Sequence, residues 1–166
     1  MTAVRFAPLE ILGVLHRHGV AFVLIGGVAG RLHGSPSLTG DLDICYDRRP
    51  ENLERLAAAL VELGARLRGV DDDVPFLLDA RTSAAGSNFT FATTAGPLDI
   101  LGSPAGVRGY DELAANAEHM DVGGVTVAVA DLDDLIRMKL AAGRPKDRVE
   151  VEILGALRDE RSAGQG

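Results

Sequence analysis

Residues 20–47, VAFVLIGGVAGRLHGSPSLTGDLDICYD, constrain the fold more than any other part of the chain. They predict an apolar strand over residues 20–25, then a glycine-led helix of about two turns that ends at Ser35 and Pro36. A second strand is predicted over residues 41–46. A helix this short cannot complete the usual crossover between parallel strands. The segment therefore argues against a fold of regularly alternating parallel units.

The rest of the chain predicts helices and strands in an irregular order. Helices are expected from Pro8 to near Gly19, from Pro50 to a cap at Gly64, over residues 110–118, from a cap at Asp131 to about Ala142, and from Pro145 onward. Strands are expected over residues 74–80, 88–94, 97–101 and 125–130, with a solvated loop at residues 71–73. This order favours a mixed α/β (α+β) fold, a small mixed sheet flanked by helices. We expect a single domain over residues 1–158 and a disordered tail over residues 159–166.

The charge balance disfavours nucleic acid as an average partner. The chain has 17 basic and 24 acidic residues, a net charge of -7, which repels polyanions. Five basic residues nevertheless gather in RMKLAAGRPKDR, residues 137–148: Arg137, Lys139, Arg144, Lys146 and Arg148. This basic stretch is either a solvated helix junction or a local site for an anionic partner.

No segment predicts insertion into a membrane or export. The longest apolar run is interrupted by glycines and is too short to span a bilayer, and the first residues lack the pattern of a signal peptide. The single cysteine, Cys45, cannot form an internal disulfide. A cytoplasmic location is therefore expected.

Three aspartates form the strongest candidate site. Asp41 and Asp43 lie two positions apart on a predicted strand, so both point to one face, where like charges are unfavourable unless a cation, water or ligand compensates them. Asp99 lies between two apolar residues in GPLDIL, as Asp43 does in DLDI. If the two strands are neighbours, the three carboxylates converge. Such a set suits two magnesium ions about 3.5–4 Å apart that clamp the oxygens of a phosphoryl transfer, and Asp99 is the best candidate to accept the proton of an attacking hydroxyl.

Each of these residues also has a structural explanation when it is taken alone. Asp41 can simply begin a strand, and Asp99 can cap a turn. Asp147 can complement the dipole of the last helix. Lys139 lies on the predicted apolar stripe of its helix, with Leu132, Leu135, Ile136 and Leu140, so it must either extend to solvent or meet an anion.

Gly26 and Gly27 follow a strand and open a helix, where a backbone can approach a phosphate closely. The spacing does not fit the G-x-G-x-x-G fingerprint of dinucleotide-binding folds, and the acidic residues begin the second strand instead of ending it. The four histidines show no zinc spacing, and no G-x-S-x-G motif supports a nucleophilic hydrolase.

The glycine pair after a strand, the hydroxyl residue before DLDI and the later single aspartate on a strand resemble the minimal nucleotidyltransferase fold of the DNA polymerase beta superfamily. This match covers residues 20–101. The C-terminal segment DLDDLIRMKLAAGRPKDRVEVEIL is similar to AbiEii-type (abortive infection) nucleotidyltransferases, many of which are toxins of toxin–antitoxin pairs. Together the two segments span most of the chain.

The resemblance implies a site with a two-metal magnesium centre. It implies that the magnesium ligands and catalytic residues are Asp41, Asp43 and Asp99. It implies that the nucleotide contacts are Gly26, Gly27, Thr39, Lys139 and Asp147, where Asp147 is the acidic residue of the RPKD motif. One departure is that many relatives have an arginine shortly before the hydroxyl residue, where this chain has Ser37 and Leu38.

The resemblance also implies a reaction. A hydroxyl attacks the α-phosphorus of a nucleoside triphosphate, and pyrophosphate leaves. For toxins of this type the acceptor is often the 3′ end of transfer RNA (tRNA), which the basic stretch from Arg137 to Arg148 could steer; the protein itself or another protein is also a possible acceptor. A separately encoded antitoxin would then be a partner.

Two further hypotheses remain open. The acceptor could be a small molecule such as an aminoglycoside, which suits the acidic net charge, although the short chain leaves little room for a separate drug-binding domain. Alternatively, the chain could be a non-catalytic binding partner or an antitoxin with the same fold. The three aspartates argue against that last hypothesis, because an inert copy does not need them.

Overall fold

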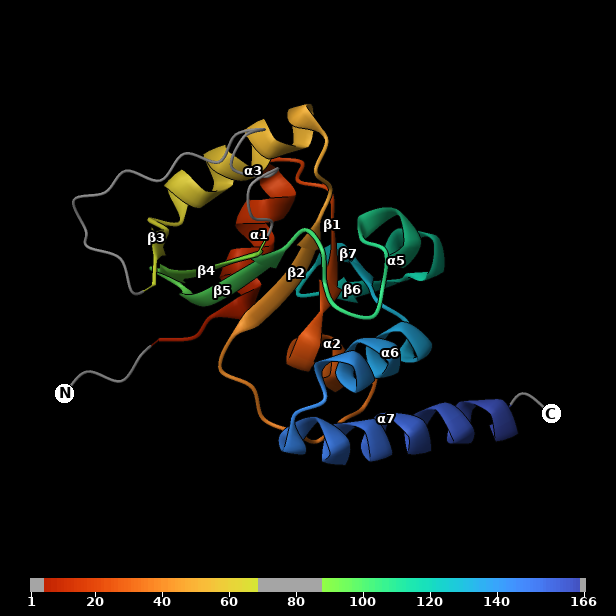
Figure 1. Cartoon of the computed structure of the whole chain (residues 1–166). Helices are drawn as coiled ribbons and strands as arrows, with labels where there is room; N and C mark the ends of the chain where they lie inside the picture. Colours follow the sequence, from red (N-terminus) through yellow and green to blue (C-terminus); the bar gives the residue numbers. More distant parts are fainter. Residues whose placement is uncertain (1–4, 69–87, 165–166) are drawn as a thin grey trace.

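The computed structural model describes residues 5–68 and 88–164 (Figure 1). In this part of the chain a seven-stranded sheet has the order β3-β4-β5-β2-β1-β7-β6. The strands are β1 (Phe22–Ile25), β2 (Leu42–Tyr46), β3 (Arg66–Leu67), β4 (Asn88–Thr93), β5 (Gly96–Leu101), β6 (Glu118–Val122) and β7 (Val125–Val129). The helices are α1 (Pro8–Arg17), α2 (Gly26–Leu32), α3 (Pro50–Glu62), α5 (Tyr110–Asn116), α6 (Leu132–Ala142) and α7 (Pro145–Gly164).

The sheet contains both parallel and antiparallel pairs. β1 and β2 are antiparallel, whereas β2 with β5 and β1 with β7 are parallel. The short α2 joins the antiparallel pair β1 and β2, so no crossover between parallel strands is needed there. The expected mixed α/β fold is thus confirmed.

Apolar periodicity places the helices against the sheet and against one another. α1 begins at Pro8 and buries Ile11, Leu12 and Leu15, which share one face of the helix. α1 packs against α3. α6 packs against α7, and these two helices lie side by side at the bottom of Figure 1. In β2, Leu42 and residues 44–46 are fully buried, so Asp43 is the one residue of this strand that the core leaves partly accessible.

Two sequence expectations differ from the structure, and a third falls outside the described residues. The helix expected over residues 110–118 ends at Asn116, and Glu118–Val122 form β6, which the sequence analysis missed because its polar residues hide the strand pattern. Residues 159–164, expected in a disordered tail, continue α7, and Arg161 of that segment binds Glu118 at 3.0 Å. The strand and loop expected at residues 71–80 lie outside the described residues.

No helix in residues 5–68 or 88–164 combines the length and the apolar character that crossing a membrane requires.

Candidate active site

Three carboxylates converge where β2 and β5 lie side by side. The parallel register places Asp43 opposite Asp99, and Asp41 comes directly before β2. One carboxylate oxygen from each residue lies within 4.8 Å of the others, and all three residues are half-buried. The predicted neighbourhood of the two strands is thereby confirmed. We refer to Asp41, Asp43 and Asp99 as the strand triad.

The strand triad is an electrostatically unfavourable arrangement. Burial raises the pKa of Asp43 to about 8, and the charge of Asp41 and the hydrogen bond and charge of Asp99 add to this effect. Oδ1 of Asp99 is buried and has no hydrogen-bond partner in the described parts of the chain. Crowded carboxylates with an unsatisfied oxygen fit a hard divalent cation such as Mg²⁺, because such a cation supplies the missing positive charge and takes oxygen ligands.

The glycine pair makes room for these side chains. Gly26 has φ +71°, and a Cβ there would lie 2.1 Å from Oδ2 of Asp43. A Cβ on Gly27 would lie 2.8 Å from Oγ1 of Thr39. Any larger residue would therefore displace either a carboxylate of the triad or the hydroxyl beside it. Thr39 in turn donates to Oδ1 of Asp41 at 3.2 Å, so its hydroxyl helps to orient the triad.

Two cations face the strand triad from α6 and from the turn after it. α6 ends at Ala142 and is capped by Gly143, whose φ of +66° is left-handed, and Arg144 precedes α7. Nζ of Lys139 lies 3.4 Å from Oδ1 of Asp147, and Nε of Arg144 lies 2.8 Å from Oδ2. Asp147 is only 2% exposed, and its hydrogen bonds from Arg144 lower its pKa.

The structure corrects one detail of the apolar stripe on α6. Lys139 is 23% exposed and points into the site, but Leu140, expected on the buried face, is 62% exposed. Leu140 lies close to the end of α6, where no described element covers this side of the helix.

Two pockets meet at the strand triad, and Asp43, Asp99, Lys139 and Arg144 line both. The larger, of about 520 Å³, is polar and includes Gly27, Ser37, Thr39, Lys146, Asp147 and Glu150. The smaller, of about 370 Å³, has a mainly apolar lining that includes Leu101, Pro104, Ala105, Leu135, Met138 and Ala142. The eight residues expected at the site thus surround one region of the molecule, since Gly26 lines the smaller pocket.

Sequence reasoning missed Arg144 and Glu150 as site residues. Glu150 accepts hydrogen bonds from the hydroxyls of Ser35 and Ser37 at 2.8 and 2.6 Å, which tie the loop before the triad to α7. The signal for Arg144 was present in RPKD, because a basic residue three positions before an aspartate at a helix start can pair with it.

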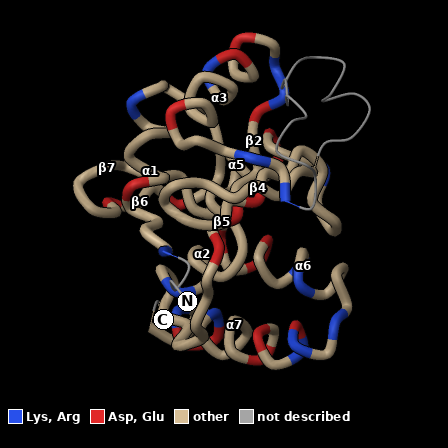
Figure 2. The backbone as a smooth tube through the Cα atoms, turned by 90° about the vertical axis from the view of Figure 1, so that its left-hand side faces the viewer, with Lys and Arg blue, Asp and Glu red and all other residues tan. Residues whose placement is uncertain are grey.

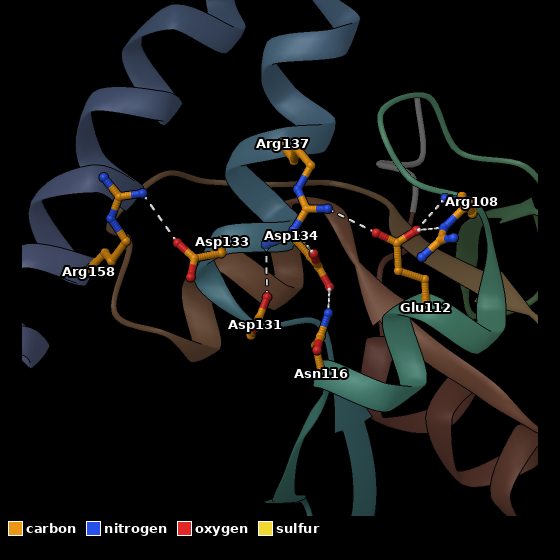
Figure 3. Close-up of polar contacts among 8 residues, drawn as sticks. All are labelled: Arg108, Glu112, Asn116, Asp131, Asp133, Asp134, Arg137 and Arg158. Atoms are coloured by element: carbon orange, nitrogen blue, oxygen red, sulfur yellow. Dashed lines mark hydrogen bonds and ion pairs between the residues drawn. The ribbon is translucent and has the colours of Figure 1, made fainter.

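The basic stretch from Arg137 to Arg148 is partly neutralised by the protein. Arg137 donates to Asp134 at 2.7 Å and to Glu112 at 2.9 Å (Figure 3), and Arg144 is bound to Asp147. Figure 2 shows basic and acidic positions mixed along α6 and α7. Of the five basic residues, Lys146 and Arg148 show no ion pair with another described residue.

No protein-family model and no curated protein matches this chain. Solved structures are similar to it in fold. Lincomycin-bound LnuA, a lincosamide antibiotic adenylyltransferase, has a TM-score of 0.61 at 14% identity over 93% of this chain and 99% of LnuA. TM1012 from Thermotoga maritima, a proposed nucleotidyltransferase, has a TM-score of 0.55 at 17% identity over 96% and 97% of the two chains. ANT(2'')-Ia in complex with adenylyl-2''-tobramycin has a TM-score of 0.54 at 17% identity over 96% and 97%. The chain therefore has the nucleotidyltransferase fold.

Proposed function

We propose that this chain is a magnesium-dependent nucleotidyltransferase, which transfers a nucleoside monophosphate from a nucleoside triphosphate to an acceptor hydroxyl. The observation that carries the proposal is the strand triad, in which three carboxylates crowd together and Oδ1 of Asp99 is left without a partner among the described residues. The fold shared with LnuA and ANT(2'')-Ia supports it.

Asp41, Asp43 and Asp99 would hold the metal. Bound there, Mg²⁺ would neutralise charge on the phosphate oxygens during transfer. The chain's own residues would do the rest. Lys139 contributes positive charge toward the triphosphate, and Gly26 and Gly27 leave the space that a side chain would fill. The acceptor oxygen bonds to the α-phosphorus, the bond from that phosphorus to pyrophosphate breaks, and Asp99 takes the hydroxyl proton.

The 3′ end of tRNA is one candidate acceptor, and it goes with the AbiEii-type resemblance. The chain would then act as a cytoplasmic toxin, with a separate antitoxin protein as its partner. Lys146 and Arg148, which have no ion pair among the described residues, are the basic side chains that remain for RNA phosphates. Arg137 and Arg144 offer less positive charge to RNA than the sequence suggests, because each is already paired with carboxylates of the protein.

A small cationic molecule is the second candidate acceptor, and one observation favours it. The chain superposes on 99% of LnuA, which was solved with lincomycin bound. The similar extent of the two chains supports a small acceptor even without a separate drug-binding domain. The net charge of -7 also suits a cation.

A label-transfer assay tests the proposal and separates the acceptors. Each of the four α-labelled nucleoside triphosphates is incubated with magnesium, the protein and either total bacterial RNA or a panel of aminoglycosides and lincosamides. Wild type is compared with Asp41→Ala, and Asp133→Asn, on the exposed start of α6, serves as the matched carboxylate control. We expect label in one acceptor class, lost only in Asp41→Ala. Absence of label in RNA, small molecules and the protein itself, together with no thermal shift by MgATP, would favour a non-catalytic binding partner.

A further inference from the structure

Arg144 has an unusual position for a surface arginine. Its side chain is 55% exposed, yet two of its nitrogens and its backbone N–H are bound to a carboxylate that is almost completely buried. Nε and Nη2 donate to Asp147 at 2.8 and 3.2 Å. The remaining N–H groups, including both on Nη1, have no partner among the described residues and stay available as donors. The guanidinium is thus fixed in place with much of its donor capacity unused.

Arg144 and the strand triad lie across a shared space. Arg144 lines both pockets together with Asp43 and Asp99, and the charges of Asp43 and Asp41 contribute to raising its pKa. No ion pair joins Arg144 or Lys139 to a triad carboxylate in the described chain, although both cations lie beside them. The separation leaves room for a polyanion between the cations and the carboxylates.

Asp147 has no free oxygen to offer a nucleotide. Oδ2 accepts from Nε and the backbone N–H of Arg144, and Oδ1 accepts from Lys139 and Nη2 of Arg144. A carboxylate would in addition repel phosphate. Its place in the first turn of α7 explains the backbone contact as a helix cap, but a cap alone does not require the three side-chain bonds from Arg144 and Lys139.

We propose that Arg144 binds the β- and γ-phosphates of the nucleotide, the part that leaves as pyrophosphate, and that Asp147 is a positioning residue which holds Arg144 and Lys139 toward them. This inference rests on the proposed nucleotidyl transfer and replaces the expected nucleotide contact of Asp147 with an indirect role. Arginine suits the task because its planar guanidinium can bind Asp147 through Nε and Nη2 and still present the N–H groups of Nη1 to a second anion.

Calorimetric titration of MgATP and of AMP into the protein tests the proposal. Arg144→Gln removes the guanidinium but keeps the backbone N–H that Asp147 caps. We expect it to weaken MgATP binding about tenfold to a hundredfold and to leave AMP binding unchanged, because AMP lacks the phosphates that Arg144 contacts. Arg144→Lys should recover part of the loss. Arg158→Gln, which removes an arginine that joins α7 to Asp133 of α6 at 3.2 Å (Figure 3), should bind both nucleotides as wild type does.

A double-mutant cycle tests the positioning role. Asp147→Asn alone should weaken MgATP binding. The loss of affinity that it causes should be smaller in the Arg144→Gln background, because part of its effect passes through Arg144. Equal affinity of wild type and Arg144→Gln for MgATP would overturn the proposal, as would an equal loss of ATP and AMP binding, which indicates a purely structural role. Failure of wild type to bind any of the four nucleoside triphosphates with magnesium would overturn the proposed function and this inference with it.

Discussion

The chain contains the tripeptide Asp-Leu-Asp twice, and the two copies have opposite surroundings. At residues 41–43 it enters a strand, and both aspartates join Asp99 without a cation bound to any of them among the described residues. At residues 131–133 it begins α6 (Figure 3). There Asp131 accepts from the backbone N–H of Asp134 at 2.8 Å, and Asp133 pairs with Arg158.

The neighbouring Asp134 makes the contrast sharper. It is fully buried, yet Asn116 and Arg137 donate to its two oxygens at 3.1 and 2.7 Å. We refer to Asp131, Asp133 and Asp134 as the helix-start cluster. Buried acidity alone therefore does not indicate a functional site in this protein. The distinguishing property is whether the protein supplies partners for the buried oxygens. Each aspartate of the helix-start cluster has a donor or an arginine partner, whereas Oδ1 of Asp99 in the strand triad has none among the described residues.

The largest expected difference between the two regions is in catalysis. Asp43→Asn should lower label transfer at least about a hundredfold, since residues that only support a metal ligand already cost about tenfold to a hundredfold and Asp43 would hold the metal directly. Asp133→Asn, the same change in the other Asp-Leu-Asp copy, should leave transfer unchanged. Rates measured per folded molecule check this. Similar rates for the two variants would contradict the assignment of the strand triad as the catalytic site.

The next effect is on stability and falls on the helix-start cluster. Asp134→Ala should lower the free energy of unfolding by about 1–3 kcal/mol, because it removes a fully buried carboxylate that accepts hydrogen bonds from Asn116 and Arg137. Denaturant titration measures the change. Label transfer by the folded fraction should remain close to wild type; its loss with stability intact would mean that this cluster also serves the reaction.

A smaller, pH-dependent effect is expected at Asp43. Because burial and its acidic neighbours raise its pKa from the ordinary 3.8 to about 8 in the folded protein, the folded state holds a proton that the unfolded state has lost. The stability of the metal-free protein should then fall as pH rises from about 4 to about 8. Asp43→Asn removes this loss and should be more stable than wild type at pH 8 by at least about 1.4 kcal/mol, one pKa unit. Thermal unfolding in a chelating buffer measures it; the two proteins should differ little near pH 4, and the difference should grow as the pH rises. A variant less stable than wild type at pH 8 would show that the carboxylate is compensated after all.

The smallest effect is expected for the exposed pair of the helix-start cluster. Arg158→Gln removes the ion pair with Asp133. The side chain of Arg158 is 48% exposed and that of Asp133 is 63% exposed. The free energy of unfolding should change by less than about 1 kcal/mol. A larger loss in denaturant titration would indicate that α7 depends on this pair for its packing against α6.

The strand triad could be predicted because it follows from short-range geometry. Alternation along a strand places Asp41 and Asp43 on one side, and an aspartate between apolar residues marks the same side of a second strand. The helices with a proline at their start, such as α1 and α3, were predictable for the same reason. The sequence could predict that the three carboxylates converge only on the condition that the two strands are neighbours. The structure shows that β2 and β5 pair in parallel.

The missed features depend on long-range contacts. Three of the five residues of β6 are polar, Glu118, His119 and Asp121, so the strand lacks a regular alternation and is held by its pairing with β7. Residues 159–164 continue α7, and Arg161 in this segment meets Glu118, which is distant in sequence. Arg144 became significant only when the turn at Gly143 brought α7 back along α6. Leu140 fitted the apolar stripe, but the end of α6 extends beyond its described neighbours.

The most direct test of the central claim is the number of divalent cations that the strand triad binds. Electron paramagnetic resonance can count Mn²⁺, a stand-in for Mg²⁺, on wild type and on Asp43→Asn in the presence of a non-hydrolysable nucleoside triphosphate. The account predicts two bound ions per wild-type chain, lost or strongly weakened in Asp43→Asn and retained in Asp133→Asn. Equal Mn²⁺ binding by wild type and Asp43→Asn would contradict the strand triad as a metal–nucleotide site.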